Sequence, residues 1–210
     1  YNFKDVSREL GLGPGDLRSS TDTEVVLNAW ARWGPDALDR LVGQFAFAVY
    51  DTRDNRLWLA RDRFGEKPLF YHEDASALSF ASSIPALLEV PWVPRELDPE
   101  SMAEYVTLRY VVSPRTVMAG INKLPGGHFL TADASGIRID RWYTPHFTQR
   151  SPERSQNDAV EEFDALLAQA SKRCLVSDVP VALLLSDGID SNSIRAALAR
   201  QNEDVRSFTF

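Results

Sequence analysis

The chain has 210 residues, of which 44% are hydrophobic and 25% charged, a composition that fits a globular protein of one or two domains. No apolar stretch reaches the roughly 18 residues needed to span a membrane, and this argues against a membrane protein. The net charge of −7, with no cluster of Lys and Arg, argues against nucleic-acid binding. The single cysteine excludes an intrachain disulfide and fits a cytoplasmic location.

The first half of the chain alternates helical and strand patterns. A helix is predicted from Thr21, with Thr21 as N-cap and Glu24 completing a capping box. Strands at 43–51 and 56–60, joined by a turn at 52–55, predict a hairpin. The segment Arg61-Asp62-Arg63, between this strand and a glycine turn, is interpreted as a structural ion-pair network. The five tryptophans have no regular spacing, so we expect them to pack in the core or between domains and not to form a stacking platform.

The second half begins with an amphipathic helix at 158–174, after a polar linker at 148–157. Its predicted buried face consists of apolar residues three and four positions apart, namely Val160, Phe163, Leu166, Leu167, Ala170 and Cys174. No His or Asn lies near Cys174 in the sequence to suggest a catalytic cysteine. We therefore expect its side chain to be buried, like a small apolar side chain.

An apolar run at 179–185 then predicts a parallel strand buried on both faces, followed by a small-residue loop and a helix at 192–200. The segment 205–210 is predicted as the second parallel strand. Amides at such a helix start attract anions. The loop lacks the Gly-Lys-Ser/Thr of a Walker A motif. Ser186 and Ser191 offer hydroxyls, Gly188 allows close approach, and Asp190 could hold Mg²⁺; the alternative is a plain strand-to-helix turn.

The loop Ser186-Asp187-Gly188-Ile189-Asp190-Ser191 resembles the Ser-Gly-Gly-x-Asp-Ser signature of the PP-loop ATP pyrophosphatases, with Asp187 in place of a glycine. A carboxylate there repels phosphate unless a cation compensates it. Together with the helix before it and the Ser-Asp-Val-Pro entry at 177–180, the loop resembles the start of the synthetase domain of asparagine synthetase.

Residues 1 to about 145 resemble the class II glutamine amidotransferase domain of the same enzymes. The resemblance rests on the order and spacing of several segments, at 21–27, 43–51, 60–71, 78–83 and 124–128. It implies an N-terminal-nucleophile α/β/β/α sandwich (α+β), followed by the beginning of a PP-loop doubly wound parallel sheet (α/β). The expected domains are 1–147, a linker at 148–157, and 158–210.

The resemblance also implies the roles of individual residues. Asp22 would pair with the α-ammonium group of glutamine, although at the start of a helix it could instead serve the helix dipole. Pyrophosphate would be held by the loop together with Mg²⁺ on Asp190, through Leu185, Ser186, Asp187, Gly188, Asp190 and Ser191. Tyr1-Asn2-Phe3 corresponds to the segment after the family's Asn-Gly-Glu. The nucleophilic cysteine is therefore expected to be missing, with no catalytic residue in this chain.

The implied function is that of a fragment of a glutamine-dependent asparagine synthetase, which amidates aspartate through an aspartyl-adenylate made with ATP. Glutamine, aspartate and ATP would be its substrates, and the parent could form a homodimer. Three alternatives stay open. They are an amidotransferase acting on another carboxylate such as a sugar acid, a β-lactam-synthetase-like ligase, and a non-catalytic homologue, the last motivated by Asp187. A histidine metal site is not expected, because no Cys or carboxylate stands at the spacing of a metal ligand from any of the three histidines, His72, His128 and His146.

Overall fold

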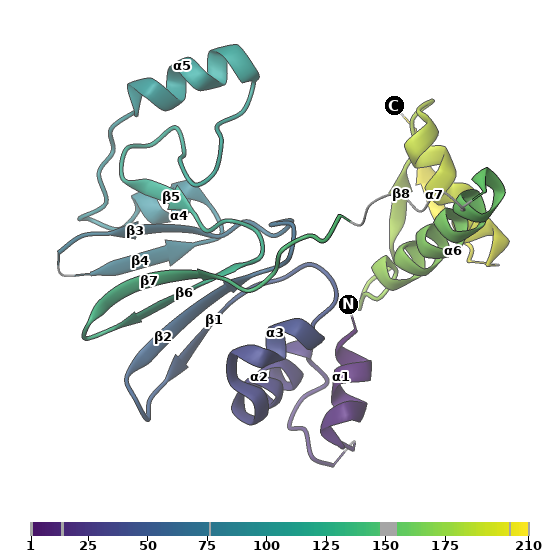
Figure 1. Cartoon of the computed structure of the whole chain (residues 1–210), viewed down its shortest axis with the longest axis horizontal. Helices are drawn as coiled ribbons and strands as arrows, with labels where there is room; N and C mark the ends of the chain where they lie inside the picture. Colours follow the sequence, from purple (N-terminus) through teal and green to yellow (C-terminus); the bar gives the residue numbers. More distant parts are fainter. Residues whose placement is uncertain (1, 14, 76, 148–154, 202, 210) are drawn as a thin grey trace. The chain divides into compact units, whose positions relative to one another are not determined.

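The chain forms two compact units, a larger one at Phe3–Pro145 and a smaller one that contains His146–Phe210 (Figure 1). The computed structural model describes residues 2–13, 15–75, 77–147, 155–201 and 203–209.

The strands of the larger unit form two antiparallel sheets, one in the order β1-β2-β6-β7 and the other in the order β4-β3-β5. The predicted hairpin is confirmed: Ala46 pairs with Arg61 and Asp51 with Arg56, and Asn55 in the turn has a φ of 57°. The elements are α1 (Phe3–Leu10), α2 (Asp22–Trp33), η1 (Gly34–Asp36), α3 (Ala37–Arg40), β1 (Ala46–Asp51), β2 (Arg56–Arg61), β3 (Phe70–Glu73), β4 (Leu78–Ala81), α4 (Ile84–Leu88), α5 (Pro99–Leu108), β5 (Ile121–Lys123), β6 (His128–Asp133) and β7 (Gly136–Arg141).

Three hydrophobic clusters stack these elements into layers. In the first, Val25 and Trp30 of α2 pack with α1 and α3 against Trp58 on one face of the four-stranded sheet. In the second, Leu59 and Leu130 from the other face of that sheet meet residues of the three-stranded sheet. In the third, α4 covers the far side of the three-stranded sheet. This order of layers, which can be followed in Figure 1, confirms the α/β/β/α sandwich expected for this part of the chain.

The smaller unit contains α6 (Gln156–Cys174), β8 (Ala182–Leu184), α7 (Ile189–Arg200) and β9 (Arg206–Phe208). Strands β8 and β9 are parallel, with Ala182 opposite Arg206, so the second parallel strand is confirmed. The prediction of a strand buried on both faces is wrong, since Val179 is 68% and Leu184 65% exposed. The strand is exposed because few elements cover it. In the described part of the chain, β8 pairs only with β9, and it also contacts α7.

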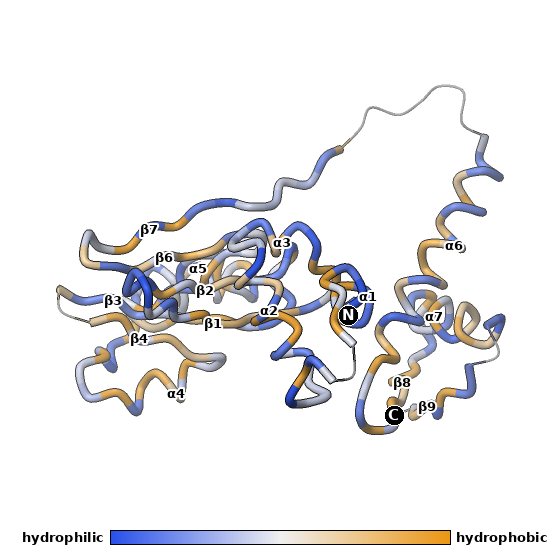
Figure 2. The backbone as a smooth tube through the Cα atoms, turned by 90° about the horizontal axis from the view of Figure 1, so that it is seen from below, coloured by the Kyte–Doolittle hydropathy of each residue, from blue (hydrophilic) through white to orange (hydrophobic). Residues whose placement is uncertain are grey.

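The buried face of α6 also differs from the prediction. Hydrophobic stretches alternate with hydrophilic ones along this helix (Figure 2), but Val160, Phe163 and Leu166 are all more than half exposed. The helix instead turns its Ala168 and Ser171 side toward α7: Ser171 is buried, and the Gln201 side chain donates to the Ala168 carbonyl at 2.9 Å.

Cys174, at the end of α6, is exposed and is not the buried hydrophobe predicted, because the stripe that contacts α7 does not include it. The helix begins at Gln156, with Ser155 and Asp158 forming a capping box. Most of the predicted linker, residues 148–154, lies outside the described residues. Among the helices of the described residues, none combines the length and apolar character that a membrane span requires.

Candidate functional site

Asp22 is the first residue of α2, and its side chain is exposed. The helix is held against the sheet by its buried residues Val25, Ala29 and Trp30. Within the described residues no hydrogen bond or ion pair to the Asp22 carboxylate is found. The carboxylate is therefore presented to solvent at the positive end of a helix, where it can accept hydrogen bonds from a cationic ligand.

The predicted capping box at the start of α2 does not form. Thr21 is the N-cap residue, but its side chain makes no capping hydrogen bond. The Glu24 carboxylate instead accepts bonds from the amides of Arg18 and Ser19, both at 2.8 Å, and from the Ser19 hydroxyl at 2.7 Å. These bonds lower the pKa of Glu24, with the bond from the Arg18 amide contributing most. The Glu24 carboxylate, which would complete the capping box, is thus bonded to the preceding loop instead.

The segment Arg61-Asp62-Arg63 is structural, as predicted, but it is not the ion-pair network expected. Asp62 is 1% exposed, and its carboxylate accepts backbone amides of Phe64 at 3.1 Å and of Glu66 and Lys67 at 2.9 Å. Arg61 donates to the carbonyls of Gly65, Lys67 and Leu124. Burial lowers the pKa of Arg61, and the nearby Asp62 carboxylate offsets this in part. The charges of Asp62 and Arg61 are therefore stabilised by hydrogen bonds with backbone amides and carbonyls.

Two glycines let the 124–128 segment pack directly on this turn. A Cβ at Gly126 would lie 2.6 Å from backbone atoms of Phe64 and Gly65. Gly127 has a φ of +68° and its amide donates to the Asp62 carbonyl at 2.7 Å. Two of the segments on which the resemblance rests, 60–71 and 124–128, are therefore packed directly against each other.

In the smaller unit, the polar segment 186–191 lies at the carboxyl end of β8 and the amino end of α7, as predicted. The helix begins earlier than predicted, at Ile189, so Asp190 and Ser191 lie in its first turn and not in a loop. The two serines of the segment contact each other, with 3.0 Å between their hydroxyl oxygens. The Ser186 amide donates to the Ser191 hydroxyl and the Gly188 amide to the Ser186 hydroxyl, each at 3.2 Å. The Leu185 amide donates to the Phe208 carbonyl at 2.8 Å. The bonds between the serines and Gly188 close the loop on itself, and the Leu185 bond joins its start to β9.

Asn192 is a loop-stabilising residue that the sequence reasoning missed. Its side-chain amide donates to the carbonyls of Ser186 at 2.9 Å and of Gly188 at 2.8 Å. It lies inside α7, where asparagine carries no sequence signal beyond its habit of bonding nearby backbone groups. That habit is the only sign in the sequence that could have indicated this role.

Asp187 and Asp190 are both exposed, and within the described residues neither carboxylate has a hydrogen-bond or ion-pair partner. The described residues contain no group of three His, Cys, Asp or Glu side chains that could hold a metal ion. Mg²⁺, however, is commonly bound by one or two carboxylates together with substrate phosphates. The two free carboxylates fit that mode of binding.

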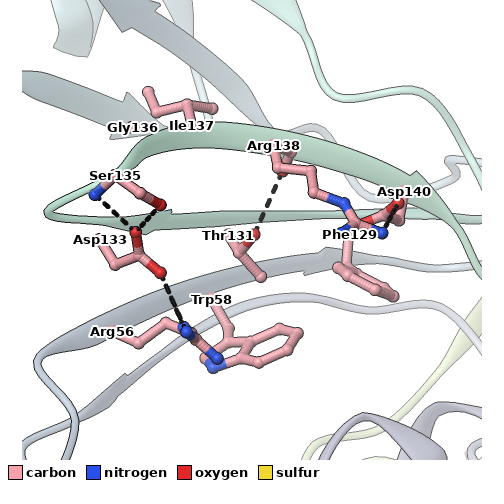
Figure 3. A pocket seen from close by; sticks show the side chains of 10 residues that line it. All are labelled: Arg56, Trp58, Phe129, Thr131, Asp133, Ser135, Gly136, Ile137, Arg138 and Asp140. Atoms are coloured by element: carbon pink, nitrogen blue, oxygen red, sulfur yellow. Dashed lines mark hydrogen bonds and ion pairs between the residues drawn. The ribbon is translucent and has the colours of Figure 1, made fainter.

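A separate cavity of about 440 Å³ lies over β2, β6 and β7 and contains none of the predicted site residues (Figure 3). Its charged side chains pair with one another: Arg56 with Asp133 at 3.0 Å, and Arg138 with Asp140 at 2.7 Å. Hydrogen bonds from Ser135, followed by that of Arg56, lower the pKa of Asp133. A charged ligand would have to break these ion pairs in order to bind, so the cavity is a poor binding site for a charged substrate.

Comparison with known proteins gives two family matches. The family described as "Glutamine amidotransferase domain" matches residues 1–143, and the family described as "Asparagine synthase" matches residues 162–210.

Curated relatives match over nearly the whole chain. Glutamine-hydrolyzing asparagine synthetase 3 of Bacillus subtilis is 36% identical over 95% of this chain and 32% of its own length. A putative glutamine-hydrolyzing asparagine synthetase of Mycobacterium bovis is 35% identical over all of this chain and 33% of its own. The chain thus spans about a third of these relatives. Among solved structures, glutamine phosphoribosylpyrophosphate amidotransferase from B. subtilis aligns with a TM-score of 0.44 and 16% identity, over 99% of this chain and 43% of that one.

Proposed function

Because the chain belongs to the family of glutamine amidotransferase domains, we propose that it is part of a glutamine-hydrolysing asparagine synthetase. The observation that carries the proposal is the order of the two matches in one chain: a glutamine amidotransferase domain at 1–143 is followed by an asparagine synthase segment at 162–210. Relatives named as asparagine synthetases match across both segments.

In the first unit, Asp22 binds glutamine through its α-ammonium group. The support is its exposed carboxylate, which has no partner among the described residues, at a helix start that the buried side of α2 holds against the sheet. A carboxylate in this state can accept charge-assisted hydrogen bonds from an ammonium group without first breaking a bond of its own. Ammonia released from glutamine is the nitrogen donor for the second reaction.

In the second unit, ATP adenylates the side-chain carboxylate of aspartate, and pyrophosphate leaves. Ammonia then attacks the acyl carbon, asparagine forms and AMP is released. The activation is needed because hydroxide is a poor leaving group and AMP a good one. The loop at Leu185, Ser186, Asp187, Gly188, Asp190 and Ser191 binds the pyrophosphate part of ATP. Mg²⁺ bound at Asp190, with Asp187 beside it, would neutralise phosphate charge.

The wider setting of the protein is also part of the proposal. We place it in the cytoplasm, which the single cysteine supports, and expect the complete protein to form a homodimer. The net charge of −7 supports the absence of a nucleic-acid partner.

The test compares two nitrogen sources in the complete protein. Asp22→Asn should raise the glutamine KM about 10- to 150-fold, the loss expected for one charge-assisted contact. Synthesis from free ammonia should be unchanged, because ammonia bypasses the first unit. Asp36→Asn, the same change at another exposed aspartate, is the control. Equal loss of both activities in the Asp22 variant would contradict the binding role, and consumption of ATP that does not depend on aspartate would contradict the proposed reaction.

A further inference from the structure

The Glu24 carboxylate fastens the loop that leads into α2. Its two oxygens accept the amides of Arg18 and Ser19 and the Ser19 hydroxyl, all at 2.7–2.8 Å. The Ser19 hydroxyl also lies 2.8 Å from that of Thr21. One side chain on the first turn of the helix therefore fixes the backbone of the residues that precede Asp22.

The start of α2 needs such a fastening because its own cap is missing. The first amides of a helix have no intrahelical partner, and an N-cap side chain usually satisfies one of them. Thr21 makes no such bond. Without the Glu24 contacts, the first turn would be free to fray, and Asp22 is its first residue. The lowered pKa of Glu24 agrees with a carboxylate that is held ionised by these donors.

We propose that Glu24 is a positioning residue for glutamine binding, which acts by holding the 18–21 loop so that Asp22 keeps its place at the start of α2. The inference rests on the proposed role of Asp22. Glu24 itself makes no contact with glutamine in this scheme, because its carboxylate oxygens are already occupied by the loop.

The test measures steady-state kinetics of the complete protein with glutamine and with ammonia. Glu24→Gln keeps the shape of the side chain but turns one oxygen into an amide group that faces a backbone N–H. It should raise the glutamine KM about tenfold and leave kcat and the ammonia-dependent rate unchanged. Ser19→Ala, which removes only the hydroxyl contacts, should give a smaller rise in the same direction. Glu89→Gln, at an exposed glutamate of the larger unit, should have no effect.

The double variant Asp22→Asn/Glu24→Gln separates positioning from an independent role. If Glu24 acts through Asp22, the double variant should have the glutamine KM of Asp22→Asn alone. Multiplied effects, or equal loss of ammonia-dependent synthesis, would overturn the positioning role. If Asp22→Asn raises KM and neither Glu24→Gln nor Ser19→Ala does, the inference is wrong and the proposed function stands. A wild-type protein that uses ammonia but not glutamine would overturn both.

Discussion

Of all the Asp→Asn substitutions in this chain, Asp62→Asn should destabilise the larger unit most. Asp62 is 1% exposed, and each of its carboxylate oxygens accepts hydrogen bonds from two backbone amides. One oxygen accepts from Phe64 and Glu66 and the other from Lys67 and Phe45, at 2.9–3.3 Å. The new NH₂ group would face two backbone N–H groups whichever way the side chain is turned. Two charge-assisted bonds of about 1.5–3 kcal/mol each are lost, so about 3–6 kcal/mol of the unfolding free energy should go.

The assay is urea unfolding of the chain followed by tryptophan fluorescence. All five tryptophans lie in the larger unit, so the signal reports on that unit alone: Trp30, Trp33, Trp58, Trp92 and Trp142. Asp54→Asn, at an exposed residue with only a 3.9 Å ion pair to Arg56, is the control and should change stability by less than about 0.5 kcal/mol. A loss below about 1 kcal/mol in the Asp62 variant would refute the reasoning, because it would mean that the buried carboxylate is not needed by those amides.

Three further outcomes are expected. Gly126→Ala should cost about 1–3 kcal/mol in the same unfolding assay, because its Cβ would meet the Phe64 and Gly65 backbone at 2.6 Å, whereas Gly13→Ala, with ordinary contacts, should cost nothing. Hydrogen bonds from the Arg53 side chain, and then from its backbone, lower the pKa of Asp51 to about 2. The stability they give should be complete above the ordinary aspartate pKa near 4 and be lost as pH falls through about 2; Asp51→Asn should remove that part of the acid dependence of unfolding. The exposed Cys174 should react with one equivalent of a thiol reagent without denaturant, and protection of the native thiol would show that it is buried.

Features that depend on neighbouring residues could be predicted from the sequence. The β1–β2 hairpin follows from two strand patterns and a short turn, and the loop between β8 and α7 follows from an apolar run that ends at small residues. Both depend on contacts within about fifteen residues. The four layers of the larger unit did not follow from such patterns. They came from the resemblance, because pairings such as β2 with β6 join segments about 70 residues apart.

The buried face of α6 was predicted wrongly because the helix carries apolar residues on several sides, and more than one of these sides could pack against a neighbour. Leu167 belongs to the predicted face, but Ala168 and Ser171 lie beside it and are small enough to let α7 approach. The partner helix therefore selects the stripe, and a polar Ser171 is buried while Phe163 is 60% exposed. Helical spacing alone could not predict this choice.

The interpretation of Arg61-Asp62-Arg63 as an ion-pair network failed for a geometric reason. Successive side chains of a strand point to opposite faces, so Arg61 at the end of β2 and Asp62 after it are directed apart. The buried Asp62 carboxylate and the partly buried Arg61 guanidinium must then find other partners, and the nearest are the amides and carbonyls of the glycine turn.

The same limit applies to the β8–α7 loop, where the motif predicts the position of the polar groups but not their state. The Ser186 amide and the Gly188 amide are bonded to the serine hydroxyls, and the Ser191 hydroxyl also donates toward carbonyls of the loop. A phosphate group that used these donors would have to replace the internal bonds, which are weak because they are exposed and long, at 3.2 Å. The Asp187 and Asp190 carboxylates have no bond to give up within the described residues. In the proposed reaction, a cation would therefore bind to them without opening the loop, and phosphate that arrived with Mg²⁺ would have to displace only the serine contacts.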